Sequence, residues 1–199
     1  MSTLPPGPFD VIYADPPWDY DGREQFGFAG DVGRSSGGAI KQYITLSLSE
    51  ICALGVAEIA ARNAILFLWA TGPQLRAAMD VIDAWGFDYK TIAFVWDKER
   101  INPGYYTLSQ HEVCLAAKRG NIPAPRGARN VRQLVRETRG QHSQKPHEVR
   151  ERIARMFPAQ RKLELFARSP ASGWEAWGNQ AGLLPPAPPS RQLELWGQL

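Results

Sequence analysis

The stretch that most constrains this chain is Asp15-Pro16-Pro17-Trp18, which directly follows the apolar run of residues 9–14. That run has the length and composition of a buried strand. Two successive prolines cannot extend the strand, because each lacks a backbone donor and has a fixed φ. The chain must therefore leave the sheet at Asp15 in a stiff turn at the carboxyl end of a strand. In open α/β sheets, ligands bind at that edge.

The groups on this turn suit a planar base that carries an exocyclic amine. Asp15 can accept one N–H of the amine, and the backbone carbonyl of Pro16 can accept the other. Trp18 offers an indole on which the base can stack, an interaction worth roughly 1–3 kcal/mol. Two acceptors outside the ring plane favour a pyramidal nitrogen and free its lone pair for attack, which is stabilisation by preorganised dipoles. The alternative is a simple strand-ending turn whose Trp18 caps the core.

Length and composition predict one domain and exclude a membrane protein. The chain has 199 residues, 44% of them hydrophobic, which is enough for one full core but not comfortably for two. No apolar run approaches the roughly 18–20 residues of a membrane span, and residues 1–7 lack the regions of a signal peptide. We therefore predict a cytoplasmic protein with no membrane partner, a single domain over residues 1–180 and a proline-rich tail over residues 181–199.

The cysteines and histidines predict neither a disulfide nor a metal site. Cys52 and Cys114 both lie in apolar surroundings, so we expect reduced, buried thiols. The three histidines do not have the spacing of metal ligands. No metal is therefore expected.

Charge is distributed unevenly along the chain. Residues 118–168 hold fourteen Lys or Arg and four Asp or Glu, whereas the remainder holds nine and sixteen. A basic block of this size on an otherwise acidic protein is typical of a surface that contacts a phosphate backbone. The alternative is a solvated helical face followed by a flexible loop.

Hydrophobic patterns predict strands that alternate with helices. Strands are expected at residues 9–14, 64–70, 89–96, 112–118, 162–167 and 173–178. Helices are expected after an N-cap at Ser47 or Ser49 and after a cap at Thr71, where Leu75, Met79 and Ile82 have helical spacing. Further helices are expected over residues 147–157 and, as a short segment, near residues 132–137. On the helix at 147–157, the arginines at 150, 152 and 155 should face solvent. This alternation predicts a doubly wound α/β sheet with mostly parallel strands.

Three polar loops at residues 19–43, 97–110 and 120–144 are candidates for gripping a substrate. A base must leave its stack to reach the turn at residues 15–18. The candidate substrate-binding residues are Trp18, Tyr43, Tyr105, Tyr106, Arg139, His142 and Lys145.

Together with three later stretches, the Asp-Pro-Pro-Trp turn resembles the MT-A70 family of S-adenosylmethionine-dependent adenine N(6)-methyltransferases. The later stretches are Glu112-Val113-Cys114-Leu115, His142-Ser143-Gln144-Lys145-Pro146, and Leu163-Glu164-Leu165-Phe166-Ala167-Arg168 followed by Gly178-Asn179-Gln180. They occur in the family's order over about residues 9–180. The resemblance implies a Rossmann-like methyltransferase fold with permuted motif order, in which the catalytic motif precedes the cofactor strand.

The resemblance also implies roles for individual residues. It implies Asp15, Pro16, Pro17 and Trp18 as catalytic residues, and Asp15, Lys145, Glu164, Arg168, Asn179 and Gln180 as binding S-adenosylmethionine. The chemistry of the cofactor agrees with this assignment, because its carboxylate needs a cation and its ribose hydroxyls need amide or carboxylate partners. Few residues precede the first strand, so we expect Phe9, Asp10 or the region around Asn179 to hold the cofactor's adenine. After Arg168 the chain reads Ser-Pro-Ala, where the family's eukaryotic catalytic subunit has a His-Asn pair.

The resulting prediction is a site-specific, adenine-specific DNA methyltransferase that acts as a monomer or homodimer on nucleic acid. DNA is preferred because small single-domain members of the family commonly act on it. RNA is the main alternative substrate, since no residue recognisably contacts a 2′-hydroxyl, and the amine of cytosine is a further variant. An alternative of another class is a non-catalytic nucleic-acid-binding subunit, which would bind oligonucleotides but not the cofactor.

Overall fold

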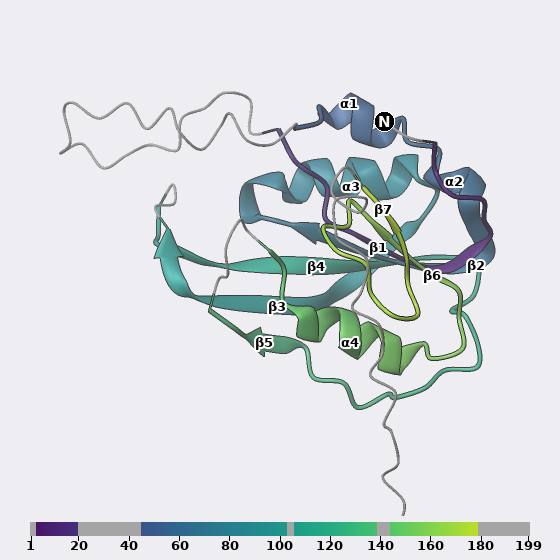
Figure 1. The fold of residues 1–199 in the computed structure, drawn as a ribbon. Helices are drawn as coiled ribbons and strands as arrows, with labels where there is room; N and C mark the ends of the chain where they lie inside the picture. The colour runs from purple at the N-terminus through teal and green to yellow at the C-terminus, as the bar shows by residue number, and fades with distance from the viewer. Residues whose placement is uncertain (1–2, 20–44, 103–105, 139–143, 179–199) are drawn as a thin grey trace, which may run out of the picture.

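The computed structural model describes residues 3–19, 45–102, 106–138 and 144–178 (Figure 1). Within them, seven strands form one sheet in the order β5-β3-β4-β2-β1-β6-β7. The strands are β1 (Phe9–Ala14), β2 (Ala60–Ala70), β3 (Asp88–Asn102), β4 (Ser109–Arg119), β5 (Leu134–Arg136), β6 (Lys162–Leu165) and β7 (Glu175–Trp177).

Strand β1 lies inside the sheet and pairs in parallel with both β2 and β6. Strand β7 pairs in parallel with β6, and β5 with β3. Because β4 is antiparallel to β2 and β3, it alone of the seven described strands is reversed. The mostly parallel α/β sheet is thereby confirmed. Its motif order is permuted, since the strand carrying the Asp-Pro-Pro-Trp turn comes first in the chain and lies beside β6.

Helices cover both faces of this sheet (Figure 1). On one face lie α1 (Leu48–Cys52), α2 (Val56–Ile59), a 3₁₀ turn η2 (Gly72–Gln74) and α3 (Leu75–Ala84), and α4 (His147–Met156) lies on the other. Side chains of β1 alternate between the two resulting hydrophobic clusters. Ile12 packs in the cluster with α3, whereas Val11 and Tyr13 pack in the cluster with α4. Burial on both faces explains why the strand reads as an unbroken apolar run.

The helices on the first face differ in detail from the sequence prediction. Ser47 is the N-cap of α1 and forms a capping box with Glu50, so the prediction holds there. Thr71 makes no capping hydrogen bond from its side chain. Because η2 occupies the residues after Thr71, α3 begins only at Leu75, which is 37% exposed. The predicted inward register of α3 is therefore wrong at Leu75, and the buried positions are Ala78, Val81 and Ile82.

Two predictions for the α4 face are also wrong. The segment near residues 132–137 forms the edge strand β5, because its backbone pairs with β3 and tertiary pairing overrides local preference. Helix α4 has the expected bounds to within one residue, but Arg152 is buried and does not face solvent. Its guanidinium donates to the carbonyls of Arg132 and Leu134, which compensates for its burial.

Both cysteines are free thiols. Cys114 is buried as predicted, whereas Cys52 is only half-buried. Burial raises the pKa of each thiol above its ordinary value, so neither resembles an activated nucleophile. In the described part of the chain, no helix is long and apolar enough to cross a membrane. The predicted tail lies outside the described residues, so the division at residue 180 stays a prediction.

Candidate active site

The Asp-Pro-Pro-Trp turn leaves the sheet where three parallel strands end together. Ala14, the last residue of β1, pairs with Leu68 of β2 and Leu165 of β6. Since the chain goes from β1 to β2 on one side and reaches β6 on the other, Asp15 lies at a switch point of the topology, where such sheets bind ligands. The Pro16 carbonyl accepts the backbone N–H of Trp18 at 2.9 Å. A carbonyl oxygen has a second lone pair, which a ligand can use.

Trp18 holds this turn against the core. Its indole is 7% exposed and packs in the cluster formed with α3. Its Nε1–H donates to the carbonyl of Trp69 at 3.2 Å. The stacking role predicted for Trp18 does not fit this placement, because the buried indole presents no open face to a base. The alternative interpretation, in which Trp18 caps the core, fits it.

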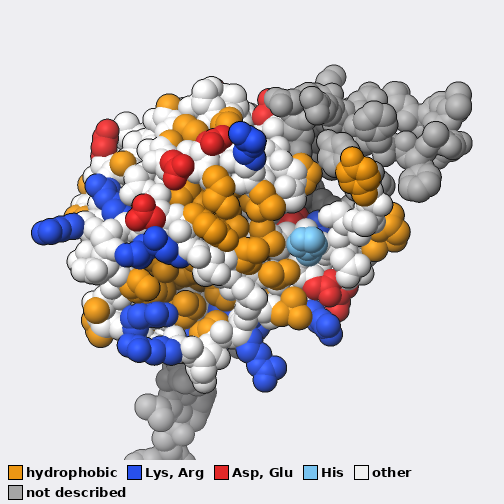
Figure 2. Space-filling view, turned by 180° about the vertical axis from the view of Figure 1, so that it is seen from behind, with side chains coloured by type: hydrophobic (Ala, Val, Ile, Leu, Met, Phe, Trp, Pro, Cys, Tyr) orange, Lys and Arg blue, Asp and Glu red, His pale blue; other side chains and the backbone are white. Residues whose placement is uncertain are grey.

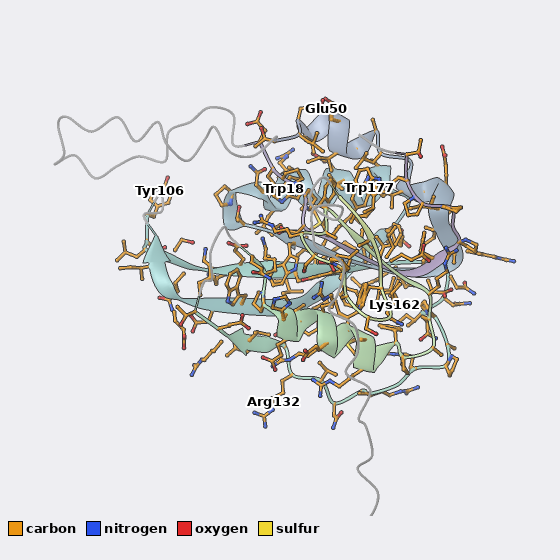
Figure 3. All side chains as sticks on the ribbon, viewed as in Figure 1. Trp18, Glu50, Tyr106, Arg132, Lys162 and Trp177 are labelled. Atoms are coloured by element: carbon orange, nitrogen blue, oxygen red, sulfur yellow. The ribbon has the colours of Figure 1, made fainter. Side chains whose placement is uncertain are left out.

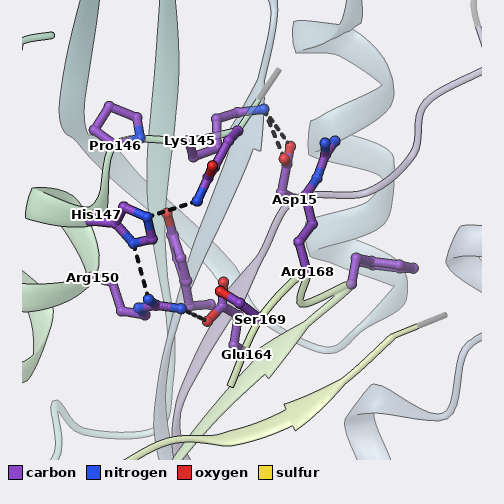
Figure 4. Close-up of a pocket in the computed structure, with 11 residues that line it drawn as sticks. Asp15, Lys145, Pro146, His147, Arg150, Glu164, Arg168 and Ser169 are labelled. Atoms are coloured by element: carbon purple, nitrogen blue, oxygen red, sulfur yellow. Dashed lines mark hydrogen bonds and ion pairs between the residues drawn. The ribbon is translucent and has the colours of Figure 1, made fainter. Parts of the chain in front are cut away.

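Lys145 reaches Asp15 from the segment before α4 (Figure 4). Its Nζ lies 2.7 Å from Oδ1 and 2.8 Å from Oδ2 of Asp15. Burial disfavours the ammonium, but Asp15 and Glu112 raise the pKa of Lys145 above its ordinary value. The lysine is therefore charged at neutral pH, and it balances the charge of Asp15.

Two further charged residues extend this pair, and neither was among the residues predicted for the site. Glu112 of β4 places Oε2 3.2 Å from Lys145 Nζ and Oε1 3.2 Å from Lys98 Nζ. Burial alone would raise the pKa of Glu112, but the two lysines hold it below its ordinary range. The available signal was a charged residue next to a buried apolar run, at the head of Glu112-Val113-Cys114-Leu115. Its partner on β3 depends on strand register, which the sequence does not specify.

A second charged network lies on the β6 side of the same pocket (Figure 4). Arg150 donates from Nη1 to Oε2 of Glu164 at 2.7 Å, and its Nη2 lies 3.1 Å from Nδ1 of His147. The prediction that Arg150 faces solvent is therefore wrong. Burial raises the pKa of Glu164 above its ordinary value, and Arg150 offsets this only in part.

The pocket brings four of the predicted cofactor residues together, namely Asp15, Lys145, Glu164 and Arg168 (Figure 4). Its full lining is Tyr13, Asp15, Gln144, Lys145, Pro146, His147, Arg150, Glu164, Phe166, Arg168 and Ser169. Asn179 and Gln180 lie outside the described residues. Cations and carboxylates face one another across this space, a donor set that suits a zwitterion with hydroxyl groups.

Phe9 and Asp10 do not belong to this pocket. Phe9 is buried in the core with the guanidinium of Arg161 4.2 Å from its ring centroid, and Asp10 Oδ2 accepts the backbone N–H of Arg161. Asp10 and Asp15 stand at opposite ends of β1, about 16 Å apart at about 3.3 Å per residue. The expectation that Phe9 or Asp10 holds the adenine of a cofactor is therefore wrong.

The predicted substrate-binding residues are described only in part. Tyr43, Tyr105, Arg139 and His142 lie outside the described residues. Tyr106 follows β3 at the tip of the β3–β4 hairpin, where its side chain is 99% exposed (Figure 3). An exposed ring in a loop beside a sheet edge can stack on a base.

Many cations of the basic block at residues 118–168 bind groups of the protein itself. At least seven of the block's fourteen cations donate hydrogen bonds to protein carbonyls or carboxylates: Lys118, Arg119, Lys145, Arg150, Arg152, Arg161 and Lys162. The face in Figure 2 shows separate Lys and Arg side chains scattered around exposed hydrophobic groups. Arg132, which precedes β5, and Arg136, its last residue, are exposed, although Arg136 Nε lies 3.7 Å from Asp97 Oδ2.

Comparison with known proteins finds a family match and related enzymes. The family model for MT-A70 matches residues 9–180. A type II methyltransferase, M.MunI, from Mycoplasma is 52% identical over 88% of this chain and 78% of its own length. An Arabidopsis thaliana N(6)-adenosine-methyltransferase MT-A70-like protein is 31% identical, and the human N(6)-adenosine-methyltransferase catalytic subunit METTL3 is 28% identical. Each of these two matches covers 87% of this chain but only 24% and 28%, respectively, of the relative's own length.

Proposed function

Because the chain belongs to the MT-A70 family, we propose that it transfers a methyl group from S-adenosylmethionine to the N(6) amine of adenine in DNA. The chain is a methyltransferase, and its relatives carry that name. The observation that carries the finer proposal is the Asp15–Lys145 pair, which shares one pocket with Glu164 and Arg168 at the carboxyl edge of the sheet.

The residues that line the pocket fit S-adenosylmethionine. Lys145 and Arg168 supply cations for its carboxylate, and Asp15 supplies an acceptor for its ammonium. Glu164 would accept from the ribose hydroxyls through Oε1, while Arg150 holds Oε2. When bound, the cofactor supplies an electrophilic methyl group on a sulfonium.

The turn would hold the acceptor amine. Asp15 and the second lone pair of the Pro16 carbonyl each accept one N–H, which positions the nitrogen lone pair toward the methyl group. A nitrogen–carbon bond forms as the carbon–sulfur bond breaks, and the nitrogen then loses one proton to solvent. The Asp15 carboxylate stabilises the positive charge that develops on the nitrogen, so no strong base is required.

DNA is proposed as the substrate because M.MunI, named a type II methyltransferase, is similar over most of both chains. Small single-domain members of the family commonly act on DNA, and the target base would leave the duplex to reach Asp15. Adenine in RNA is the second candidate. It is favoured by the names of the relatives at 31% and 28% identity, which are N(6)-adenosine-methyltransferases.

The test is an assay of the purified protein with methyl-labelled cofactor and a panel of single- and double-stranded DNA and RNA. Nucleoside mass spectrometry then identifies the product. We expect N(6)-methyladenine in DNA. Label in RNA alone would establish the second candidate, and label on cytosine would contradict both. Binding of oligonucleotide without binding of cofactor would identify a non-catalytic subunit.

A further inference from the structure

We propose, on the basis of the function proposed above, that Lys98 is a positioning residue for the Asp15–Lys145 pair. Lys98 would act through Glu112. It would hold the Glu112 carboxylate in the position where Glu112 and Asp15 both contact the ammonium of Lys145. Neither motif spacing nor the family resemblance singles out Lys98.

The four side chains form a row of alternating charge. Asp15 contacts Lys145, Lys145 contacts Glu112 at 3.2 Å, and Glu112 contacts Lys98 at 3.2 Å. Each oxygen of the Glu112 carboxylate faces a different lysine. The row contains two cations and two anions, so it is neutral as a unit.

The row also becomes more buried toward Lys98, which is 6% exposed. A buried cation is costly unless it is paired. Without Lys98, Lys145 would be the one cation shared by the Asp15 and Glu112 carboxylates. Attraction to the more buried Glu112 would then draw Lys145 away from Asp15.

The backbone of β3 places Lys98 for this task. Phe94 and Trp96 are buried in the cluster on the α4 face, and Lys98 continues the same two-residue alternation. A lysine thus occupies a position where the pattern favours an apolar side chain. Immediately after it, Glu99 has a φ of +53°, and the pairing of β3 with β4 shifts register. Such irregularities next to a site re-aim side chains.

This arrangement has a use when the amine enters. Lys145 contacts both oxygens of Asp15, and one of those oxygens must become available to an N–H of the base. Glu112 already lies 3.2 Å from the same ammonium. Lys145 can therefore keep its contact with Glu112 while it gives up its contact with one oxygen of Asp15. The position of Glu112, and hence the balance between its two neighbours, is set by Lys98.

The test is a double-mutant cycle of Lys98→Met, Glu112→Gln and both together, read as single-turnover methylation rates. Lys98→Met should lower the rate about 10-fold, within the range of coupling between contacting charges, and should change the KM for oligonucleotide less than about twofold. In the Glu112→Gln background, Lys98→Met should change the rate less than about twofold. Lys90→Met, an exposed lysine on the same strand, is the matched control and should behave as the wild type.

A full rate in folded Lys98→Met would overturn the proposal. An equal loss in both backgrounds would also overturn it, because Lys98 would then act independently of Glu112. Should Lys98→Met fail to fold, the double variant compared with Glu112→Gln alone decides between these outcomes, since it removes the neutral pair together. Wild type that methylates nothing would instead refute the proposed function.

A crystal structure of Lys98→Met gives a readout that needs no activity. Lys145 should shift toward Glu112 and lose contact with both oxygens of Asp15, which is more than the release of one oxygen that the amine requires. A contact kept between Lys145 and either oxygen of Asp15 would contradict the positioning role.

Discussion

The ammonium of Lys145 lies 2.7 Å and 2.8 Å from the two carboxylate oxygens of Asp15, although the residues are 130 positions apart in the chain. The fold creates this contact, because Asp15 directly follows the end of β1 beside β6 and the segment before α4 crosses the same edge of the sheet. The carboxylate proposed to accept one N–H of the amine is thus already oriented by a cation. That preorganisation is where we expect most of the site's catalytic effect to arise.

The Glu112 carboxylate should give the domain part of its acid sensitivity. Burial opposes its charge, but Lys145 and Lys98 lower its pKa, so its folded-state pKa lies below the unfolded value of about 4.3. The stability it contributes is therefore present above that value and is lost as the pH falls through the folded pKa. Glu112→Gln should lower the free energy of unfolding at neutral pH and should have a smaller effect at an acidic pH below the unfolded value of about 4.3, as measured by denaturant titration. Glu137→Gln, an exposed side chain, is the matched control. A cost that is the same at both pH values would count against the ion pairs.

Arg152 should be a structural residue of α4 that makes no contribution to binding. It donates to Glu148 and to the carbonyls of Arg132 and Leu134, and Arg152→Met would leave those carbonyls without this donor. We expect a loss of about 2 kcal/mol in the free energy of unfolding, or about 5 °C in Tm. Arg155→Met, on the exposed side of the same helix, should cost less than about 0.5 kcal/mol. Equal effects of the two variants on denaturant unfolding would contradict the assignment.

Trp18 should anchor the turn without stacking on a base. Trp18→Phe keeps an aromatic ring but removes the donor to the Trp69 carbonyl, which should cost about 1–2 kcal/mol of unfolding free energy. Trp85→Phe removes an equivalent bond, to Ile51, and serves as the control. Methylation per folded molecule should fall less than about threefold in both variants. A stable Trp18→Phe protein that has lost activity would favour the stacking role.

Arg136 should contact substrate phosphate, because it ends β5 at the carboxyl edge of the sheet and its side chain is 70% exposed. Arg136→Gln should reduce the slope of log binding constant against log salt by about 0.9, the value for one lost phosphate contact. Arg132→Gln, before the start of β5, is the control and should leave the slope unchanged. An unchanged slope in Arg136→Gln would place the phosphate contacts elsewhere.

Local sequence was sufficient to predict the features that depend on local physics. The strand at residues 9–14, the departure of the chain from the sheet at Asp15 and helix α4 follow from apolar runs and from proline chemistry, and the structure confirms them. Family motifs placed Lys145 near Asp15. The roles of Glu112 and Lys98 could not be predicted in this way, because they depend on the register between β3 and β4, which shifts beside Lys98.

The predictions that proved wrong also failed because they depend on contacts between segments far apart in the sequence. Arg152 follows a pattern that is typical of solvent exposure, yet carbonyls from the segment around β5 compensate for its burial. Strand β5 itself is only three residues long and is fixed by pairing with β3. Trp18 carries no local signal that separates a stacking surface from a core anchor. In the fold it packs in the core and donates to the carbonyl of Trp69, which is 51 residues away.

The most direct test of the central claim is the Asp15→Ala variant, measured by cofactor calorimetry and by nucleoside mass spectrometry on adenine-containing DNA. If Asp15 receives the amine, the variant should still bind S-adenosylmethionine, because Lys145, Glu164 and Arg168 remain, but it should form no detectable N(6)-methyladenine. Full methylation by Asp15→Ala would contradict the account.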